Sequence, residues 1–125
     1  ISNLDGLNEV VSIGGNLDFG HNPALINLTG LDNLATIGED LSVSFNDNLI
    51  SLSGLDNLTF IGSVLNIQFN HSLISLDGLE GLTGLNAHCL INSNDNLFNF
   101  TGLNNITFID GTLQISHNQQ LNNLY

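Results

Sequence analysis

The sequence repeats itself every 24 residues, and this period constrains the fold more than any other feature. Residues 28–38 read LTGLDNLATIG, and residues 52–62, which begin 24 positions later, read LSGLDNLTFIG. Self-similarity at a fixed period of about 20–50 residues is the signature of a stacked repeat array. With Leu4 as position 1, the repeats follow one another without insertion or deletion: 4–27, 28–51, 52–75, 76–99 and 100–123. We therefore expect a single repeat-solenoid domain over residues 1–125.

The apolar positions of the repeat predict an all-β solenoid. Apolar residues recur at positions 1, 4, 7, 10, 14, 16 and 22, and the stretch L-x-I-x-x-N alternates like a short, half-buried strand. Stacked repeats place such strands side by side, in parallel and about 4.8 Å apart. One repeat cannot bury its apolar face alone, so the core must continue from each repeat to the next.

An asparagine occupies position 19, directly after the predicted strand. Its side-chain amide can bond the backbone of the adjoining turn through both its oxygen and its nitrogen. Repeated in every turn, it would satisfy loop backbone groups that no sheet covers. The sequence therefore predicts a structural Asn ladder, formed by Asn22, Asn46, Asn70, Asn94 and Asn118.

Other recurring residues predict bends and surface features. Glycine at position 3 of every repeat indicates a tight bend or a positive φ. Position 11 holds glycine three times and then Asn86 and Asp110, residue types that tolerate left-handed backbone, so we expect a positive φ there too. Phenylalanines at positions 9 and 18 are expected to form a second packed layer under the loops. A candidate exposed apolar stripe lies at position 23: Ile26, Ile50, Ile74 and Phe98.

The charge of the chain excludes several classes of partner. Its 125 residues include no Lys or Arg and 12 Asp or Glu, which gives a formal net charge of −12. Contacts to nucleic-acid phosphates need Lys or Arg, and so does docking on anionic membrane. No apolar run is long enough to span a bilayer. We predict neither nucleic-acid binding nor membrane insertion. Cys89, the single cysteine, takes a position that is Leu in the other repeats and is expected to be buried.

The repeat pattern L-x-G-L-x-N-L-x-x-I-G-x-x-L-x-I-x-x-N-x-x-L resembles the receptor L-domain branch of leucine-rich-repeat proteins, the module of insulin-receptor and EGF-receptor ectodomains. Related repeats occur in fungal GPI-anchored cell-wall proteins and in secreted bacterial surface proteins. The resemblance implies a right-handed parallel β-solenoid, here of five 24-residue coils, outside the cell or on its surface. It implies no catalytic residue. The matching residues of one repeat are Leu52, Gly54, Leu55, Leu58, Ile61, Gly62, Leu65, Ile67, Asn70 and Leu73.

A search for reactive groups gives no catalytic residue, no metal ligand and no cofactor. The four histidines, at 21, 71, 88 and 117, do not cluster at metal-ligand spacing. Position 5 would stack three carboxylates, those of Asp32, Asp56 and Glu80. Such an acidic column is either a solvated edge or an oxygen-rich site for calcium, and both interpretations stay open.

Five N-x-S/T sequons offer sites for N-linked glycans. Asn70 belongs to the ladder and is expected to be buried and unmodified. The glycosylation candidates are Asn27, Asn57, Asn99 and Asn105.

Two functional hypotheses follow, and neither is an enzyme. The first is an extracellular structural repeat protein, a segment of a cell-surface fibre, stalk or adhesin. The pattern starts and stops in mid-repeat, and open solenoid ends expose strand edges that normally need caps, so we expect flanking repeats or end-to-end self-association. The alternative is a receptor-like or carbohydrate-binding recognition module. Ice binding ranks below both, because Thr59, Thr83 and Thr107 form only a short threonine column.

Overall fold

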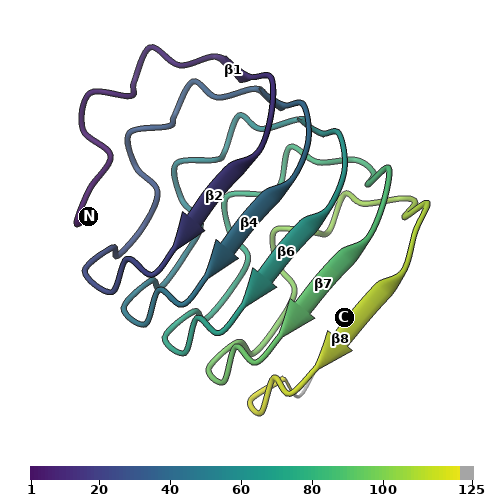
Figure 1. Ribbon diagram of the computed structural model, residues 1–125. Coiled ribbons are helices and arrows are strands. Elements are labelled where there is room, and N and C mark those ends of the chain that lie inside the picture. Colours follow the sequence, from purple (N-terminus) through teal and green to yellow (C-terminus); the bar gives the residue numbers. More distant parts are fainter. Residues whose placement is uncertain (122–125) are drawn as a thin grey trace.

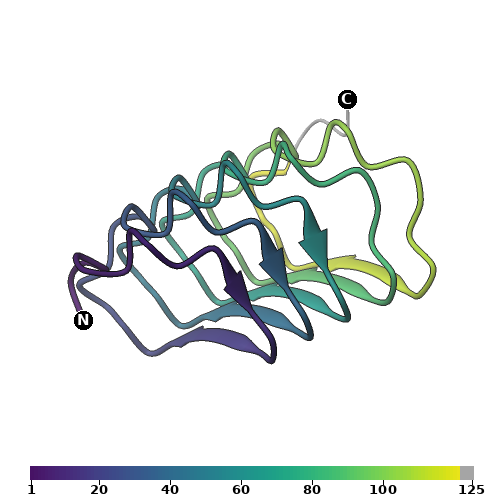
Figure 2. The same cartoon turned by 90° about the horizontal axis from the view of Figure 1, so that it is seen from above.

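The chain winds into an all-β parallel solenoid of about four turns, with a spacing of 24 residues between equivalent positions (Figure 1). This computed structural model describes residues 1–121, and all regular structure within that range is β-strand. The fold class that the repeat period predicts is thus confirmed. Figure 2 shows the turns stacked behind one another, with strands on two sides of the stack.

The main sheet carries the strands that the L-x-I motif predicts. Its five parallel strands lie in the order β2-β4-β6-β7-β8. Each residue pairs with the residue 24 positions later, as Leu41 does with Leu65. This register places the same repeat position of neighbouring turns side by side. The strands are β2 (Leu17–Gly20), β4 (Leu41–Ser44), β6 (Leu65–Gln68), β7 (Cys89–Asn92) and β8 (Leu113–Ser116).

A smaller sheet covers a second side of the stack. It contains three two-residue strands, β1 (Ser12–Ile13), β3 (Thr36–Ile37) and β5 (Phe60–Ile61), in the order β1-β3-β5. The pairing again joins residues 24 positions apart. Past β5 the sheet stops, and the next parallel bridge on this side joins Leu85 to Ile109.

The core lies between the two sheets and is filled by the predicted apolar positions. In the inner turns these side chains are fully buried, as Leu55, Leu58 and Ile61 illustrate at 0% exposure. Cys89 is equally buried, as its leucine position predicts. The same positions open toward solvent at the two ends of the described stack, where Leu7 is 40% and Leu113 is 52% exposed. Burial therefore depends on a neighbouring turn on each side, as expected for a repeat array.

Glycine recurs at repeat positions 3 and 11 for different structural reasons. Position 3 has the predicted positive φ in every repeat, from 98° at Gly6 to 113° at Gly30 and Gly78. The prediction for position 11 is wrong, because no residue at that position has a positive φ among the described residues. Glycine is needed there for close approach instead. A Cβ added to Gly62 would overlap the carbonyl oxygen of Gly38 on the preceding turn.

The residue at position 11 changes from glycine to asparagine on the turn where the smaller sheet ends. The backbone N–H of Gly62 donates to the carbonyl of Ile37 at 2.9 Å. Asn86 occupies the equivalent position on the next turn, and its backbone N–H does not donate to the Ile61 carbonyl. Its side-chain Nδ2 instead reaches the Ile61 carbonyl, at 3.4 Å. The residue change at position 11 thus replaces a backbone hydrogen bond with a longer side-chain one, and the strand pairing stops at β5.

Replacing Asn86 with glycine is expected to extend the smaller sheet by one strand. A regained backbone hydrogen bond contributes about 0.5–1.5 kcal/mol, from which the entropy of the added glycine subtracts roughly 0.5–1 kcal/mol. We expect the free energy of unfolding, measured by urea denaturation, to rise by up to about 1 kcal/mol. Asp110→Gly is the matched control, because the Asp110 N–H already donates to the Leu85 carbonyl at 2.9 Å. An equal gain in both variants would contradict this explanation.

Candidate functional site

The Asn ladder continues the hydrogen bonding of the main sheet past the ends of its strands. From Asn46 onward, each Oδ1 accepts the backbone N–H of the asparagine 24 residues earlier, as Asn70 accepts that of Asn46 at 3.2 Å. Each inner Nδ2 donates to the carbonyl 27 residues earlier, as Asn70 donates to Val43 at 2.9 Å. Asn46, Asn70 and Asn94 are fully buried. The role of these residues is therefore structural, and the Nδ2 of Asn70, to which a glycan would attach, is already occupied.

The four glycosylation candidates divide into two pairs by their hydrogen bonds. The Nδ2 of Asn57 donates to the Asp32 carbonyl at 2.6 Å, and the Nδ2 of Asn105 donates to the Glu80 carbonyl at 2.8 Å. Both bonds join neighbouring turns. Asn27 and Asn99 are instead bonded through Oδ1, which accepts the backbone N–H of the residue two positions later. A glycan on Nδ2 would therefore disturb inter-turn bonds at the first pair and spare them at the second.

The acidic column at position 5 holds the glycine bends. Asp32, Asp56 and Glu80 each accept the backbone N–H of the glycine two residues earlier, at 2.8 Å in all three repeats. These bonds account for the recurrence of an acid beside the positive-φ glycine. Among residues 1–121, no group of three or more His, Cys, Asp or Glu side chains is placed to hold a metal ion.

The histidines lie apart and make different contacts. His71 Nδ1 lies 2.8 Å from Asp95 Oδ2 on the surface. His88 Nδ1 accepts the backbone N–H of Thr112 at 2.9 Å, which bridges two turns at the start of β7 and β8. His21 packs its ring against that of Phe45, with 4.6 Å between the ring centroids.

A column of left-handed residues at position 18 is the main surface feature that the sequence did not reveal. Its members, His21, Phe45, Phe69, Ser93 and His117, all have φ between 55° and 57°. We call them the position-18 column. They follow the strands of the main sheet and precede the ladder, whose asparagines take the interior space. The phenylalanines were expected to pack under the loops, and this is wrong for Phe45, which is 45% exposed.

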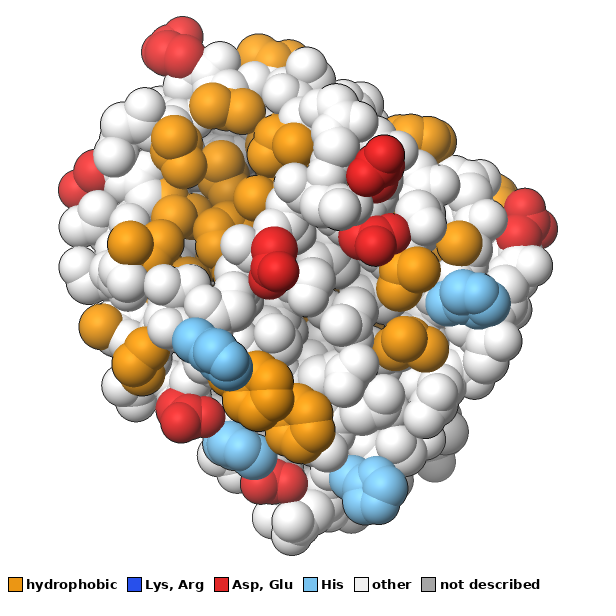
Figure 3. All heavy atoms as spheres, viewed as in Figure 1, with side chains coloured by type: hydrophobic (Ala, Val, Ile, Leu, Met, Phe, Trp, Pro, Cys, Tyr) orange, Lys and Arg blue, Asp and Glu red, His pale blue; other side chains and the backbone are white. Residues whose placement is uncertain are grey.

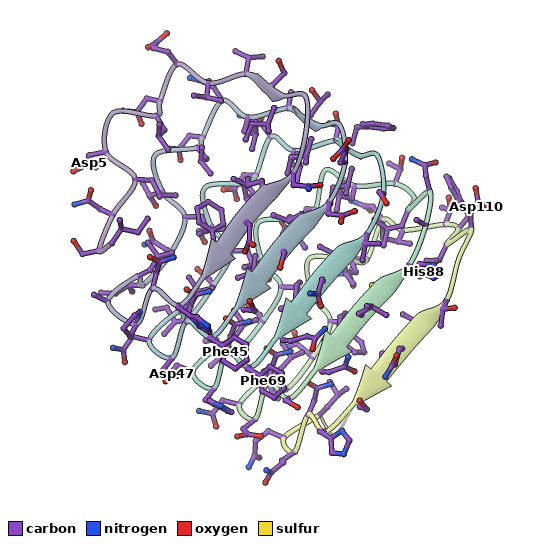
Figure 4. All side chains as sticks on the ribbon, in the orientation of Figure 1. Asp5, Phe45, Asp47, Phe69, His88 and Asp110 are labelled. Atoms are coloured by element: carbon purple, nitrogen blue, oxygen red, sulfur yellow. The ribbon has the colours of Figure 1, made fainter. Side chains whose placement is uncertain are left out.

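The rings of Phe45 and Phe69 stack on each other at the ends of β4 and β6 (Figure 4). Their centroids are 4.7 Å apart and their planes differ by 9°. The spacing equals the distance of about 4.8 Å between neighbouring parallel strands, so the sheet itself sets the stacking distance. Position 9 also departs from the expectation of a packed layer, because Phe60 and Phe108 are 43% and 48% exposed.

The candidate apolar stripe at position 23 is exposed along its whole length. Ile26, Ile50, Ile74 and Phe98 are between 45% and 54% exposed. Backbone bonds fix their spacing, since the N–H of each donates to the carbonyl of the one before it, at 2.9 to 3.2 Å. A rigid row of exposed apolar side chains is a candidate contact surface.

The outer face of the main sheet carries a shallow, mixed hollow of about 290 Å³. Acidic, amide and hydroxyl side chains line it together with two apolar side chains. Most of the lining residues are polar, and Val64 and Leu90 are the apolar exceptions. The lining residues are Asn16, Asp18, Asp40, Ser42, Val64, Asn66 and Leu90.

Cys89 is buried, so its thiol is unreactive. The ionisation of this thiol nevertheless affects the stability of the fold. Removal from solvent raises the pKa of the Cys89 thiol from 9.0 to about 11. The thiol therefore keeps its proton to a higher pH in the folded protein than in the unfolded chain. The resulting contribution to stability is complete below pH 9.0 and is lost as the pH rises toward about 11. We expect the free energy of unfolding to fall across this window by up to about 1.4 kcal/mol per pH unit. Cys89→Leu, the residue of the other repeats, should remove this part of the slope, and an unchanged slope would refute the assignment.

Comparisons of the chain with protein-family models, with curated proteins and with solved structures give no match. Within the described residues, the structure contains no helix long and apolar enough to cross a membrane.

Proposed function

We propose that this chain is a segment of a non-enzymatic, extracellular structural repeat protein that belongs to a cell-surface fibre, stalk or adhesin. The observation that carries the proposal is the unbroken register of 24 residues through the main sheet, from β2 to β8. Each turn offers the next one the same strand edge, the same core positions and the same ladder amide. A structure of this kind grows by addition of identical turns.

The receptor L-domain type of leucine-rich repeat is the family we propose, with five right-handed coils. The inter-turn ladder and the positive-φ glycine at position 3 support it, because both occupy the repeat positions on which the resemblance rests. The repeats here are of constant length, which suits a structural array.

The surface chemistry suits an exposed extracellular role. Acidic side chains are scattered over the face that Figure 3 shows, and the chain contains no Lys or Arg. Proteases that cleave after Lys or Arg therefore find no site in this chain. We propose N-linked glycans as a further part of this surface, with Asn27 and Asn99 favoured because their Nδ2 atoms are spared from inter-turn bonds.

Electron microscopy of the native material tests the proposal. We expect long, thin fibres, and X-ray diffraction from aligned fibres should show a reflection near about 4.8 Å along the fibre axis. Mass spectrometry of the same material should find glycan at Asn27 and Asn99 before Asn57 and Asn105. Discrete monomeric particles would overturn the fibre proposal.

The hollow on the main sheet favours the alternative, a recognition module for carbohydrates. It combines hydrogen-bonding groups with the apolar side chain of Leu90. Ser42→Ala and Asn66→Ala test this alternative on a glycan array. Loss of a glycan signal in variants that keep the wild-type unfolding curve would support recognition over a purely structural role.

A further inference from the structure

We propose that the position-18 column contains a binding site for the guanidinium group of an arginine side chain on a partner protein, at the turn where Ser93 replaces a ring. The aromatic contacts run from His21 to Phe45 and from Phe45 to Phe69. They stop there because the next member of the column, Ser93, has no ring. His117 resumes the column one turn later, with the same φ of 55°.

The spacing of the turns leaves room for one planar group along the column at the level of Ser93. Two turn spacings of about 4.8 Å separate the backbones of Phe69 and His117 by roughly 9.6 Å. A planar occupant at the level of Ser93 would therefore lie one turn spacing from each. The stacked pair Phe45 and Phe69, at 4.7 Å, shows that the column already holds rings at this separation. This separation of 4.7 Å is also shorter than the distance of about 6 Å within which a cation is attracted to the face of a ring.

An acidic side chain on the same turn as Ser93 favours a cation. Asp95 follows Ser93 by two residues, and its side chain is 38% exposed. Its oxygens are bonded to His71 Nδ1 at 2.8 Å and to Gln119 Nε2 at 3.1 Å. A carboxylate has about four acceptor positions, so each oxygen retains one. Figure 3 shows histidine and acidic side chains beside exposed hydrophobic side chains at this end of the main sheet, where Figure 4 places Phe45, Asp47 and Phe69.

Arginine fits this combination better than lysine or a neutral ring. Guanidinium is planar and stacks on aromatic faces, and its fork of N–H groups matches a carboxylate. The ammonium group of lysine is compact and strongly hydrated, and a neutral aromatic ring gains nothing from Asp95. The chain carries a formal charge of −12 and no Lys or Arg, so such a cation must come from a partner. This inference does not depend on the structural role proposed above.

An NMR titration of the ¹⁵N-labelled protein with the peptide acetyl-Gly-Arg-Gly-amide tests the site. We expect saturable amide shifts confined to the neighbourhood of Phe69, Ser93, Asp95 and His117. The peptide acetyl-Gly-Lys-Gly-amide should cause smaller shifts at equal concentration, and acetyl-Gly-Phe-Gly-amide should cause none at these residues. Equal shifts with the arginine and lysine peptides would show that the acidic surface attracts any cation, and this result would overturn the proposal. A matching response to the phenylalanine peptide would overturn the assignment to a cation.

Two substitutions at one residue distinguish a closed gap from an open one. Ser93→Phe fills the gap with a ring that the same left-handed backbone already accepts at Phe45 and Phe69. We expect it to weaken binding of the arginine peptide by about tenfold or more, the scale of a partly desolvated cation–π contact. Ser93→Gly suits the positive φ, leaves the gap open and should bind like the wild type. If Ser93→Phe does not fold, Phe69→Leu removes one wall of the gap and should weaken binding. Undiminished shifts in a folded Ser93→Phe or Phe69→Leu variant would refute the site.

Discussion

Replacing Asn70 with alanine is expected to lower the free energy of unfolding by about 3–5 kcal/mol. The side chain of Asn70 is fully buried and joins three turns, since its Nδ2 also donates to Asn94 Oδ1 on the following turn at 3.2 Å. Its Oδ1 accepts the N–H of Asn46 at 3.2 Å, and its Nδ2 donates to the carbonyls of Val43 at 2.9 Å and Gln68 at 3.1 Å. Alanine would leave the Asn46 N–H unpaired in the interior and would remove the amide bond to the Val43 carbonyl, while the Gln68 carbonyl keeps the N–H of Phe45 at 3.2 Å. Each such group costs roughly 1–3 kcal/mol, so the total is large for one substitution.

Urea denaturation with a shared m-value is the measurement, and Asn22→Ala is the matched control. Asn22 occupies the same repeat position at the first turn. Its Nδ2 donates to the Gly20 carbonyl at 3.1 Å and its Oδ1 accepts from the N-terminal amine of Ile1 at 3.0 Å, both in solvent-exposed settings. Water can replace these partners, so the loss should stay below about 1 kcal/mol. Similar losses at the two positions would show that the ladder acts through asparagine's local turn preference, and not through bonds between turns.

Much of the interior follows from the sequence because stacking places each residue against its own equivalents. Leu31, Leu55 and Leu79 recur at one position, and the structure buries all three within 1% exposure. Asn46 and Asn70 are predicted in the same way, since a polar residue that recurs beside a core must find its partners on the neighbouring turn. The period of 24 residues therefore carries both the parallel register and the hydrogen-bonding pattern.

The glycine at position 11 shows where the sequence is ambiguous. Glycine is required by a positive φ and also by close approach of another backbone, and the residue letter is the same in both cases. Asparagine tolerates a positive φ, so Asn86 favoured that interpretation. In the structure Asn86 instead marks the place where the approach is lost and the smaller sheet ends. The two reasons can be told apart only from the distance between the backbones of neighbouring turns, and the sequence of a repeat does not give that distance.

The position-18 column was beyond prediction for a different reason. Phenylalanine rarely adopts a left-handed backbone, so Phe45 and Phe69 gave no sign of one. The succession of His, Phe, Phe, Ser and His also has no common chemical property. Their shared φ comes from the turn that brings the following asparagine into the ladder. The candidate site at Ser93 is visible only once this shared conformation aligns the side chains on neighbouring turns.

Gly54→Ala is expected to destabilise the fold by about 4 kcal/mol or more, because it combines two unfavourable effects. The φ of Gly54 is 111°, a conformation that costs a residue with a Cβ roughly 1–3 kcal/mol. The new Cβ would also overlap the carbonyl group of Leu28 on the preceding turn. Relief of that overlap would push the two turns apart and weaken their hydrogen bonds and core contacts.

Gly6→Ala separates the two effects, because Gly6 has a similar φ of 98° but nothing within 4 Å of an added Cβ. It should therefore show the conformational cost alone, about 1–3 kcal/mol by chemical denaturation. The difference between the two variants measures how firmly one turn resists displacement from the next. If Gly54→Ala were no worse than Gly6→Ala, neighbouring turns would be free to move apart by the width of a methyl group. Close contact between turns would then not be what fixes glycine at position 3, and positive φ would be a sufficient cause.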